Sequence, residues 1–288
     1  MAYSASGKEA LRRGIKLLAL DLDGTLLTTG KRLTKRTEQA LKDAFAAGIE
    51  PVWVTGRPFH GIPREIFALP GARYAISSNG AVTTELATNA ILRTRCIAPD
   101  TACGIVKLAM ARKLVHSVIV DGYGYCEAGF YDKLLAHYEH NPPIYAYIRA
   151  SRRPAPDIER TIHDAETGAE NIWMVARDRD ERDELKARIC GAWPVQSYIM
   201  SERDVEFGHP QADKGLALAE LAARLGIGRE CILSLGDNEN DLGMFSVSGI
   251  SAAMGNGTAQ AKAAADLTAD PNDNDGAAKV IEWVLDGR

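Results

Sequence analysis

The chain has 288 residues, and its 34 Lys and Arg against 38 Asp and Glu give a formal net charge of −4. Hydrophobic residues make up 46% and charged residues 25%, which excludes a disordered, collagen-like or disulfide-stapled chain. The mild acidity argues against a dedicated nucleic-acid binder, and no apolar run reaches the roughly 18 residues of a membrane span. The length suits two domains or one large one.

The cysteines and the amino-terminal residues both indicate the same cellular compartment. The five cysteines form no C-x-x-C pair, and their odd number leaves no complete set of disulfides. Residues 1–14 contain no apolar stretch of signal-peptide length, so we expect them to form an N-terminal extension. We therefore expect a cytoplasmic protein with reduced thiols.

The first part of the chain alternates strand and helix patterns. Residues 15–20 form an almost continuous apolar run, which is typical of a strand buried on both faces of a parallel sheet. The patterns that follow predict a helix at 34–47, a strand at 49–54, a helix at 58–69 and a strand at 74–77. This order predicts a doubly wound α/β sheet.

A different pattern begins after residue 82. It predicts antiparallel strands in 82–95, a helix at 99–114, strands at 117–121 and 125–129, a helix near 130–140, a strand at 172–176, a helix at 180–190 and two short strands in 195–207. The stretch 141–169 is rich in Pro, Arg and Asp and is predicted to be irregular. This block reads as an inserted α+β domain.

The α/β pattern returns at Lys214. Here the sequence predicts a helix at 216–225, a strand at 231–235, a helix from 239, a strand at 250–253 and helices at 258–265 and 276–285. The predicted fold is α/β: a doubly wound, mostly parallel sheet core formed by residues 15–82 and 208–288, with an α+β domain of residues 83–207 inserted into it.

Polar side chains follow the predicted strands of the core. They are Asp21 and Asp23, Thr55, Asn79 and Asp237. Because ligands of open α/β sheets bind at the carboxyl ends of the strands, we expect these side chains to converge. Clustered carboxylates repel one another unless a cation neutralises them, and oxygen ligands favour a hard cation such as Mg²⁺.

Two basic residues complete the predicted site. Lys214 and Arg57 would add positive charge beside the carboxylates, and Thr55 would add a hydroxyl. Turn amides, a lysine and a divalent cation together are suited to hold a phosphoryl group. An acidic and amide-rich run, residues 236–241, also follows an apolar strand. Each pattern alone could be an ordinary turn. Together, however, they occur in order along the chain, with each acidic or hydroxyl group at a predicted strand end, and this indicates one site.

With these motifs the sequence resembles the haloacid dehalogenase-like superfamily and, within it, the Cof-type phosphatases with a type IIB cap. The matching stretches are Asp21-Leu22-Asp23-Gly24-Thr25, Thr55-Gly56-Arg57, Lys214-Gly215, Gly236-Asp237-Asn238-Glu239-Asn240-Asp241, Ser78-Asn79-Gly80-Ala81 and Ala253-Met254-Gly255-Asn256. The insertion lies between Arg57 and Lys214, where type II members carry their cap. One departure is Gly243, where the Cof pattern often has an acidic residue.

The resemblance implies a Rossmann-like core, a specificity cap and a phosphoryl-transfer mechanism. Asp21 would attack phosphorus and form an aspartyl-phosphate. Asp23 would protonate the leaving alcohol and then activate water. Mg²⁺ would be held by the Asp21 carboxylate, the Asp23 backbone carbonyl and Asp237.

The same resemblance assigns the remaining residues. Thr55, the Gly56 amide and Arg57 would bind the phosphate. Lys214 would neutralise charge on the nucleophile and the phosphate. Asn240 would contact the substrate, and Asp241 would support the metal's waters or Lys214.

The sequence leaves several functions open. The leading hypothesis is a Mg²⁺-dependent phosphatase acting on small phosphomonoesters, with sugar phosphates as the usual class among relatives. The alternatives are a phosphomutase of the phosphomannomutase type and a non-catalytic sugar-phosphate-binding module. The expected partner is a small phosphorylated molecule, with no nucleic acid and no membrane, for a protein that is a monomer or a weak homodimer.

Overall fold

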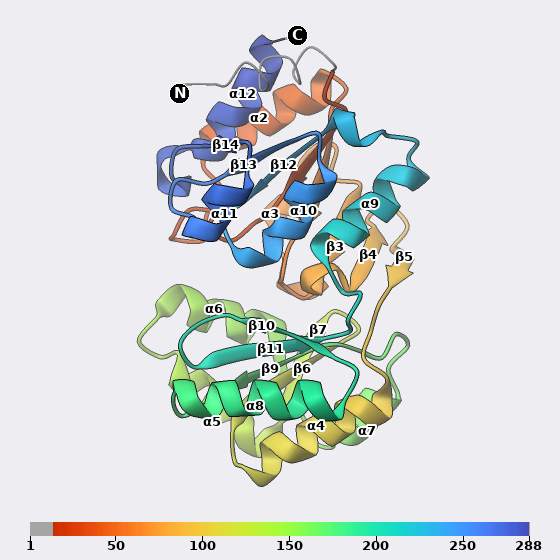
Figure 1. Cartoon of the computed structure of the whole chain (residues 1–288), viewed down its shortest axis with the longest axis vertical. Coiled ribbons are helices and arrows are strands. Elements are labelled where there is room, and N and C mark those ends of the chain that lie inside the picture. Colours follow the sequence, from red (N-terminus) through yellow and green to blue (C-terminus); the bar gives the residue numbers. More distant parts are fainter. Residues whose placement is uncertain (1–13, 288) are drawn as a thin grey trace. The chain divides into compact units, whose positions relative to one another are not determined.

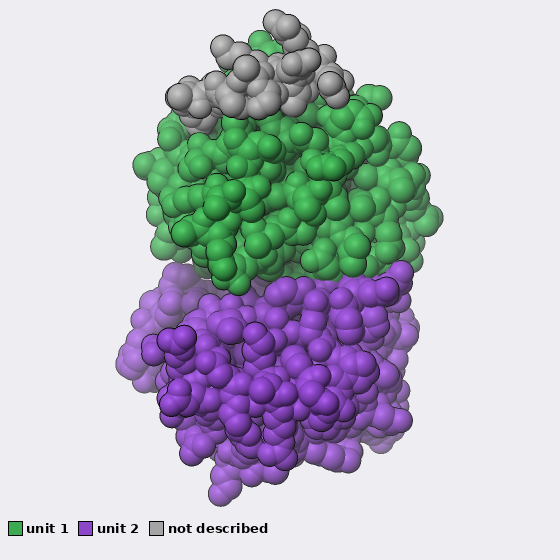
Figure 2. Space-filling model, viewed as in Figure 1, with its two compact units in different colours: residues 1–56, 63–93, 213–288 green, residues 57–62, 94–212 purple. Residues whose placement is uncertain are grey.

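The computed structural model describes residues 14–287, so nearly all of the predicted N-terminal extension lies outside the described residues. Contacts divide the chain into two compact units (Figure 2). Unit 1 comprises the chain up to Gly56, residues 63–93 and the chain from Asp213 onward; unit 2 comprises residues 57–62 and 94–212. The chain thus leaves unit 1 and returns to it, as an inserted domain does.

Unit 1 is built on an eight-stranded sheet (Figure 1). Its strand order is β14-β13-β12-β1-β2-β3-β4-β5, with the six strands from β14 to β3 parallel and β4 antiparallel to β3. The strands are β1 (Leu17–Leu20), β2 (Glu50–Val54), β3 (Tyr74–Ser77), β4 (Val82–Glu85), β5 (Ala90–Thr94), β12 (Ile232–Gly236), β13 (Ile250–Ala253) and β14 (Leu267–Thr268). The predicted mostly parallel α/β core is confirmed.

The central strand β1 explains why the sheet is covered on both faces. All four of its side chains are buried. Leu17 and Ala19 belong to the apolar cluster that contains the helix α9, and alternation along a strand sends Leu18 and Leu20 to the opposite face. An apolar residue at every position is stable only when helices cover both faces.

The helices of unit 1 pack against the sheet and against one another. The helices α9 and α10 contact each other, and α12 packs on α2, which contacts β2. The helices of this unit are α2 (Lys35–Ala46), α3 (Arg64–Phe67), α9 (Lys214–Arg224), α10 (Leu242–Val247), α11 (Ala259–Ala264) and α12 (Gly276–Asp286), with 3₁₀ turns at Ser78–Gly80, Arg229–Cys231, Glu239–Asp241 and Asn272–Asn274.

Unit 2 contains a separate six-stranded sheet of order β10-β11-β9-β6-β7-β8, antiparallel except for the β7–β8 pair. Its strands are β6 (Val115–Val120), β7 (Tyr123–Glu127), β8 (Arg152–Ala155), β9 (Ala169–Val175), β10 (Gln196–Ile199) and β11 (Asp204–Gly208). Its helices are α4 (Pro99–Ala111), α5 (Ala128–His137), α6 (Pro142–Ser151), α7 (Ile158–His163) and α8 (Arg179–Ala192), with a 3₁₀ turn at Phe59–Gly61.

Strand β9 divides the apolar side chains of unit 2 between two clusters. Ile172 and Met174 pack in a cluster with residues of α4, α7 and α8. Trp173 and Val175 alternate with them and pack in a second cluster with residues of α5 and α6. No helix in the described part of the chain is long and apolar enough to cross a membrane.

Two element predictions were wrong. The helix predicted at 58–69 is a 3₁₀ turn at Phe59–Gly61 followed by the short α3, because Pro63 separates the two pieces. The irregular stretch predicted at 141–169 contains α6, β8 and α7. Asn141 and Asp157 cap the two helices, and the proline at the start of α6 occupies a position that needs no backbone donor.

The unit boundaries differ in detail from those in the sequence analysis. Unit 2 takes up the chain at Thr94 rather than at 83, because β4 and β5 extend the sheet of unit 1. It ends at Ala212 rather than at 207. It also includes residues 57–62, which immediately follow Gly56.

Candidate active site

Two aspartates lie at the carboxyl ends of neighbouring strands. Asp21 follows β1 and Asp237 follows β12, and the two strands pair in parallel with Leu20 opposite Leu235. The Asp21 amide donates to the Leu235 carbonyl at 3.1 Å, which continues the ladder one residue beyond β1. Sheet pairing therefore brings together residues from opposite ends of the sequence.

Lys214 connects this strand edge to the start of α9. It is the first residue of the helix, and the Asp213 side chain caps the helix by accepting from the Leu216 amide. The Lys214 Nζ donates to Asp21 Oδ1 at 2.7 Å and to Asp241 Oδ1 at 2.6 Å. Its side chain is only 1% exposed, so the ammonium is held between the two carboxylates away from solvent.

Asp241 fixes the turn that carries Asp237. Its Oδ1 accepts from Lys214, while its Oδ2 accepts from the Asp237 and Asn238 amides at 2.8 and 3.1 Å. The Asp241 side chain is fully buried. Since both of its oxygens are engaged by the protein, Asp241 is placed to orient Asp237 and Lys214.

The site concentrates more negative than positive charge. Burial raises the pKa of Asp21 well above its ordinary value, although Lys214 opposes the shift. Burial, followed by the charge of Asp241, raises the pKa of Asp237 to about 6. Burial alone would lower the pKa of Lys214, but Asp21 and Asp241 outweigh it and hold this pKa above its ordinary value. The positive charge near Asp21 and Asp237 is therefore not sufficient to keep the pKa of either carboxyl group at its ordinary value.

These carboxylates fit a divalent cation. One oxygen from each of Asp21, Asp237 and Asp241 lies within 4.8 Å of the others. With Lys214 present, the set leaves two negative charges uncompensated. Gly24 keeps the space beside Asp237 open, because a Cβ at this left-handed position would lie 2.3 Å from Asp237 Oδ2. Oxygen donors of this kind suit a hard cation.

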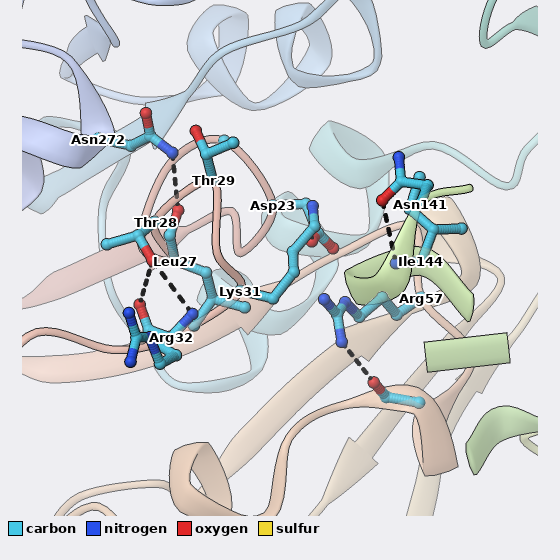
Figure 3. A network of polar contacts seen from close by, with 12 residues as sticks. Asp23, Leu27, Thr28, Thr29, Lys31, Arg32, Arg57, Asn141, Ile144 and Asn272 are labelled. Atoms are coloured by element: carbon cyan, nitrogen blue, oxygen red, sulfur yellow. Dashed lines mark hydrogen bonds and ion pairs between the residues drawn. The ribbon is translucent and has the colours of Figure 1, made fainter. Parts of the chain in front are cut away.

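The Asp23 side chain has a different partner. Its Oδ1 accepts from Lys31 Nζ at 2.6 Å, and the side chain is about one-third exposed. Figure 3 shows Lys31 reaching Asp23 from the loop after Leu27. The Thr28 side chain tightens that loop by donating to the Arg32 carbonyl and accepting from the Arg32 amide. Asp23 thus stands beside a cation, outside the cluster of three carboxylates.

Thr55 and Gly56 lie beside a second polar turn. The Asn79 amide donates to the Thr55 carbonyl at 3.1 Å, and a Cβ on Gly56 would lie 3.0 Å from Asn79 Oδ1. The same Oδ1 accepts from Asn240 Nδ2 at 2.9 Å. Asn79 therefore brings together the Thr55-Gly56 turn and Asn240, the residues predicted to hold phosphate and substrate.

Arg57 makes its described contacts within unit 2. Its Nη1 donates to the Gly61 carbonyl at 2.8 Å (Figure 3), and its guanidinium lies 4.7 Å from the centre of the Tyr147 ring. The side chain is buried. The structure thus places the last residue of the Thr-Gly-Arg motif with residues of α6 and the Phe59–Gly61 turn.

Sequence reasoning missed two supporting residues and the contacts of a third. Lys31 belongs to no motif, and its pairing with Asp23 depends on the fold of the loop between them. Tyr147 lies in a stretch predicted to be irregular. Asn79 was singled out as a strand-end residue, but its contacts with Gly56 and Asn240 join segments that lie far apart in the sequence.

Comparison with known proteins identifies a family. A sequence profile of the haloacid dehalogenase-like hydrolases matches residues 18–281. The chain is 26% identical over 277 residues to the Bacillus subtilis protein named "Putative phosphatase YxeH", covering 94% of this chain and 98% of that one. It is 25% identical over 276 residues to the 5-amino-6-(5-phospho-D-ribitylamino)uracil phosphatase YcsE of the same organism, covering 94% and 96%.

A solved structure gives the same result. A haloacid dehalogenase-like hydrolase from B. subtilis superposes with a TM-score of 0.79 at 26% identity, covering 93% of this chain and 99% of that one. The match extends over both units, and the family profile spans the predicted motifs. These findings confirm the predicted class of enzyme, a phosphoric monoester hydrolase. The chain therefore belongs to the haloacid dehalogenase-like hydrolases.

Proposed function

We propose that the protein is a Mg²⁺-dependent phosphatase that hydrolyses small phosphomonoesters, sugar phosphates in particular, through an aspartyl-phosphate. The observation that carries the proposal is the buried contact of Lys214 with both Asp21 and Asp241, next to Asp237. A carboxylate nucleophile, a fixed ammonium and uncompensated carboxylates are the groups that covalent phosphoryl transfer needs.

In this proposal Asp21 is the nucleophile. A carboxylate oxygen attacks phosphorus, the bond between phosphorus and the ester oxygen breaks, and the leaving oxygen takes a proton from Asp23. Lys214 holds Asp21 in position through Oδ1 and opposes the negative charge that gathers on the phosphoryl oxygens. Thr55, Gly56 and Arg57 bind those oxygens, and Asn240 contacts the substrate.

Asp23 then serves as the general base. It takes a proton from the water that attacks the aspartyl-phosphate, so Asp21 is released as a carboxylate together with inorganic phosphate. The Lys31 Nζ lies 2.6 Å from Asp23 Oδ1, so this ammonium directly contacts the carboxyl group that carries the proton. Lys31 is therefore placed to influence the proton transfers.

The metal would be held by the Asp21 carboxylate, the Asp23 backbone carbonyl and Asp237, with Asp241 orienting the turn. When bound, Mg²⁺ neutralises charge on the nucleophile and the phosphoryl group. The carboxylate cluster supports a divalent cation, and its oxygen-only donor set supports Mg²⁺ in preference to a softer metal.

The relatives support a small substrate. YcsE is named for a phosphorylated ribityl compound, and phosphorylated polyols and sugars have a similar ester group and hydroxyls. We propose that unit 2 is the cap and acts as the specificity element, and that the protein is a cytoplasmic monomer or weak homodimer.

A phosphate-release assay tests this function. Purified protein with Mg²⁺ should release inorganic phosphate from p-nitrophenyl phosphate and, at higher kcat/KM, from some members of a panel of hexose, pentose and polyol phosphates. A phosphomutase would instead move the phosphoryl group between positions of one sugar. A binding module would release none. Either result would overturn the proposal.

Replacing Asp23 by Asn should lower kcat by about 10² to 10⁴, since general acid–base catalysis contributes this much. The amide keeps the shape but neither gives up nor takes up a proton near neutral pH, so both half-reactions should slow. The measurement is the pH dependence of kcat, in which the wild-type limb assigned to this group should disappear. A pH profile identical to that of the wild type would remove Asp23 from this role.

The metal site should also make stability depend on pH. Since the folded-state pKa of Asp237 is raised to about 6, the metal-free fold holds a proton that the unfolded chain releases nearer 4. Metal-free stability contributed by this group therefore falls as pH rises through about 4 to 6. Mg²⁺ should raise the melting temperature more at pH 7 than at pH 4.5.

Differential scanning calorimetry with and without Mg²⁺ measures this effect. The variant Asp237→Asn has no carboxylate to titrate at this position, so its metal-free stability should fall less over the same interval. Equal Mg²⁺ stabilisation at pH 4.5 and pH 7 in the wild-type protein would contradict the expectation.

Substitutions in unit 2 should change substrate preference. The phosphate-binding residues contact a group that all phosphomonoesters share, so they discriminate poorly among leaving groups. Alanine substitutions of polar unit 2 residues should change relative kcat/KM among sugar phosphates by about tenfold, while the small substrate acetyl phosphate is affected far less. Losses by one common factor for every substrate would instead make the cap a general lid.

A further inference from the structure

The turn at Ser78–Gly80 has an unusual backbone. Ser78, Asn79 and Gly80 follow one another with φ of 49°, 55° and 89°. The left-handed region is sparsely populated by residues that carry a Cβ, so two consecutive non-glycine residues there must be held by their surroundings. The turn is also buried, which places those surroundings inside unit 1.

This turn presents Asn79 to the candidate site. The Asn79 side chain lies against Gly56 and accepts from Asn240 at 2.9 Å. A rotation of the turn would move this side chain relative to both partners. The position of Asn79 relative to Gly56 and Asn240 therefore depends on the contacts that hold the backbone of the turn in place.

Arg93 on β5 holds it. Its Nη1 donates to the Gly80 carbonyl, and its Nε donates to Glu220 Oε2 on α9 at 3.0 Å. The Arg93 side chain is 4% exposed, whereas that of Glu220 is 50% exposed. The guanidinium thus extends from the surface of α9 to the backbone of the turn.

The start of α9 blocks the other side of Gly80. A Cβ on Gly80 would lie 2.3 Å from the Asp213 carbonyl oxygen and 2.9 Å from the Lys214 nitrogen. The turn is therefore confined between Arg93 and the backbone that begins the Lys214 helix. Arg93 is also the last residue of unit 1 before the chain passes into unit 2.

We propose that Arg93 is a positioning residue for the reaction: by fixing the Gly80 carbonyl it holds Asn79 against Gly56 and Asn240. The proposal rests on the proposed function, in which Gly56 and Asn240 bind phosphate and substrate. A planar guanidinium donates in two fixed directions at once, which a lysine ammonium cannot reproduce.

The test is a double-mutant cycle. Arg93→Lys keeps the charge and should lower kcat/KM for p-nitrophenyl phosphate about tenfold, mainly through a higher KM. Asn79→Gly removes the side chain without straining the left-handed backbone. If Arg93 acts through Asn79, Arg93→Lys should have little further effect in the Asn79→Gly protein. Independent, multiplying losses would overturn the proposal.

Two control variants separate this role from general loss of an ion pair. Arg36→Lys disrupts an exposed two-pronged contact with Glu282 and should leave KM unchanged. Glu220→Gln removes the charge that faces Arg93 but leaves the Gly80 contact, so it should raise KM much less than Arg93→Lys. An equal rise in KM for Glu220→Gln and Arg93→Lys would assign the effect to the ion pair and overturn the proposal.

Amide hydrogen exchange tests the same contact without turnover. Amides of the Ser78–Gly80 turn should exchange at least about tenfold faster in Arg93→Lys than in the wild type. Absence of phosphate release by the wild type would defeat the proposed function but leave this comparison valid. Unchanged exchange in an active wild-type background would overturn the positioning role alone.

Discussion

Replacing Asp21 by Asn is expected to reduce kcat by at least about a thousandfold while the protein remains folded. An amide oxygen can still accept from Lys214, which donates to Asp21 at 2.7 Å, but it is a poor nucleophile toward phosphorus. The substitution also removes one of three mutually repelling carboxylates, and this offsets the loss of a partner for the buried ammonium. Phosphate release under saturating substrate measures the effect.

A matched variant gives the control. Asp43→Asn makes the same chemical change on the exposed face of α2, where the aspartate accepts from Gln39. It should retain wild-type kcat. A trapped phosphoenzyme, detected by mass spectrometry after acid quench of the wild type, should be absent from Asp21→Asn. If Asp21→Asn released phosphate at close to the wild-type rate, the nucleophile would have to be another residue.

Removal of divalent metal is expected to abolish turnover. Excess EDTA should reduce phosphate release to background, and added Mg²⁺ should restore it, because two negative charges around Asp21 and Asp237 would otherwise face the phosphate dianion. Calcium should restore activity poorly, since its larger and more flexible coordination suits the site less well.

The variant Asp237→Asn should shift the Mg²⁺ requirement upward by about tenfold or more, because it replaces a charged ligand by a neutral one. The Asp237 amide is held by Asp241, so the turn should keep its shape in the variant. Activity titrated against free Mg²⁺ measures the shift, with Asp43→Asn again as the control. Full wild-type turnover in excess chelator would overturn the metal proposal.

The strand-end prediction shows why the sequence was informative about this site. The runs before Asp21, Thr55 and Asp237 could be assigned to parallel strands because a strand buried on both faces is apolar at most positions. Parallel strands end at a common edge. The convergence of these residues therefore followed from local patterns combined with one rule of topology.

The local sequence pattern predicted the wrong elements where a proline can either begin or interrupt a helix. Pro142 and Pro143 made residues 141–169 look irregular, yet proline is well placed in the first turn of α6. In the helix predicted at 58–69, Pro63 instead divides the segment. Whether a proline begins or interrupts a helix depends on whether its position in the helix needs a backbone N–H donor. The sequence pattern does not show which position the proline will occupy.

The sequence by itself determined the α/β core, and it predicted an inserted domain and the residues whose carboxylates, hydroxyl and ammonium we propose for phosphoryl transfer. Only the tertiary structure decided how those groups are paired: Lys214 between Asp21 and Asp241, Lys31 on Asp23, and Arg93 behind the turn of Asn79. The physical reason is the separation along the chain over which each kind of information acts. Hydrophobic periodicity acts over one element, whereas a hydrogen bond depends on ångström-scale placement of segments that lie far apart in the chain.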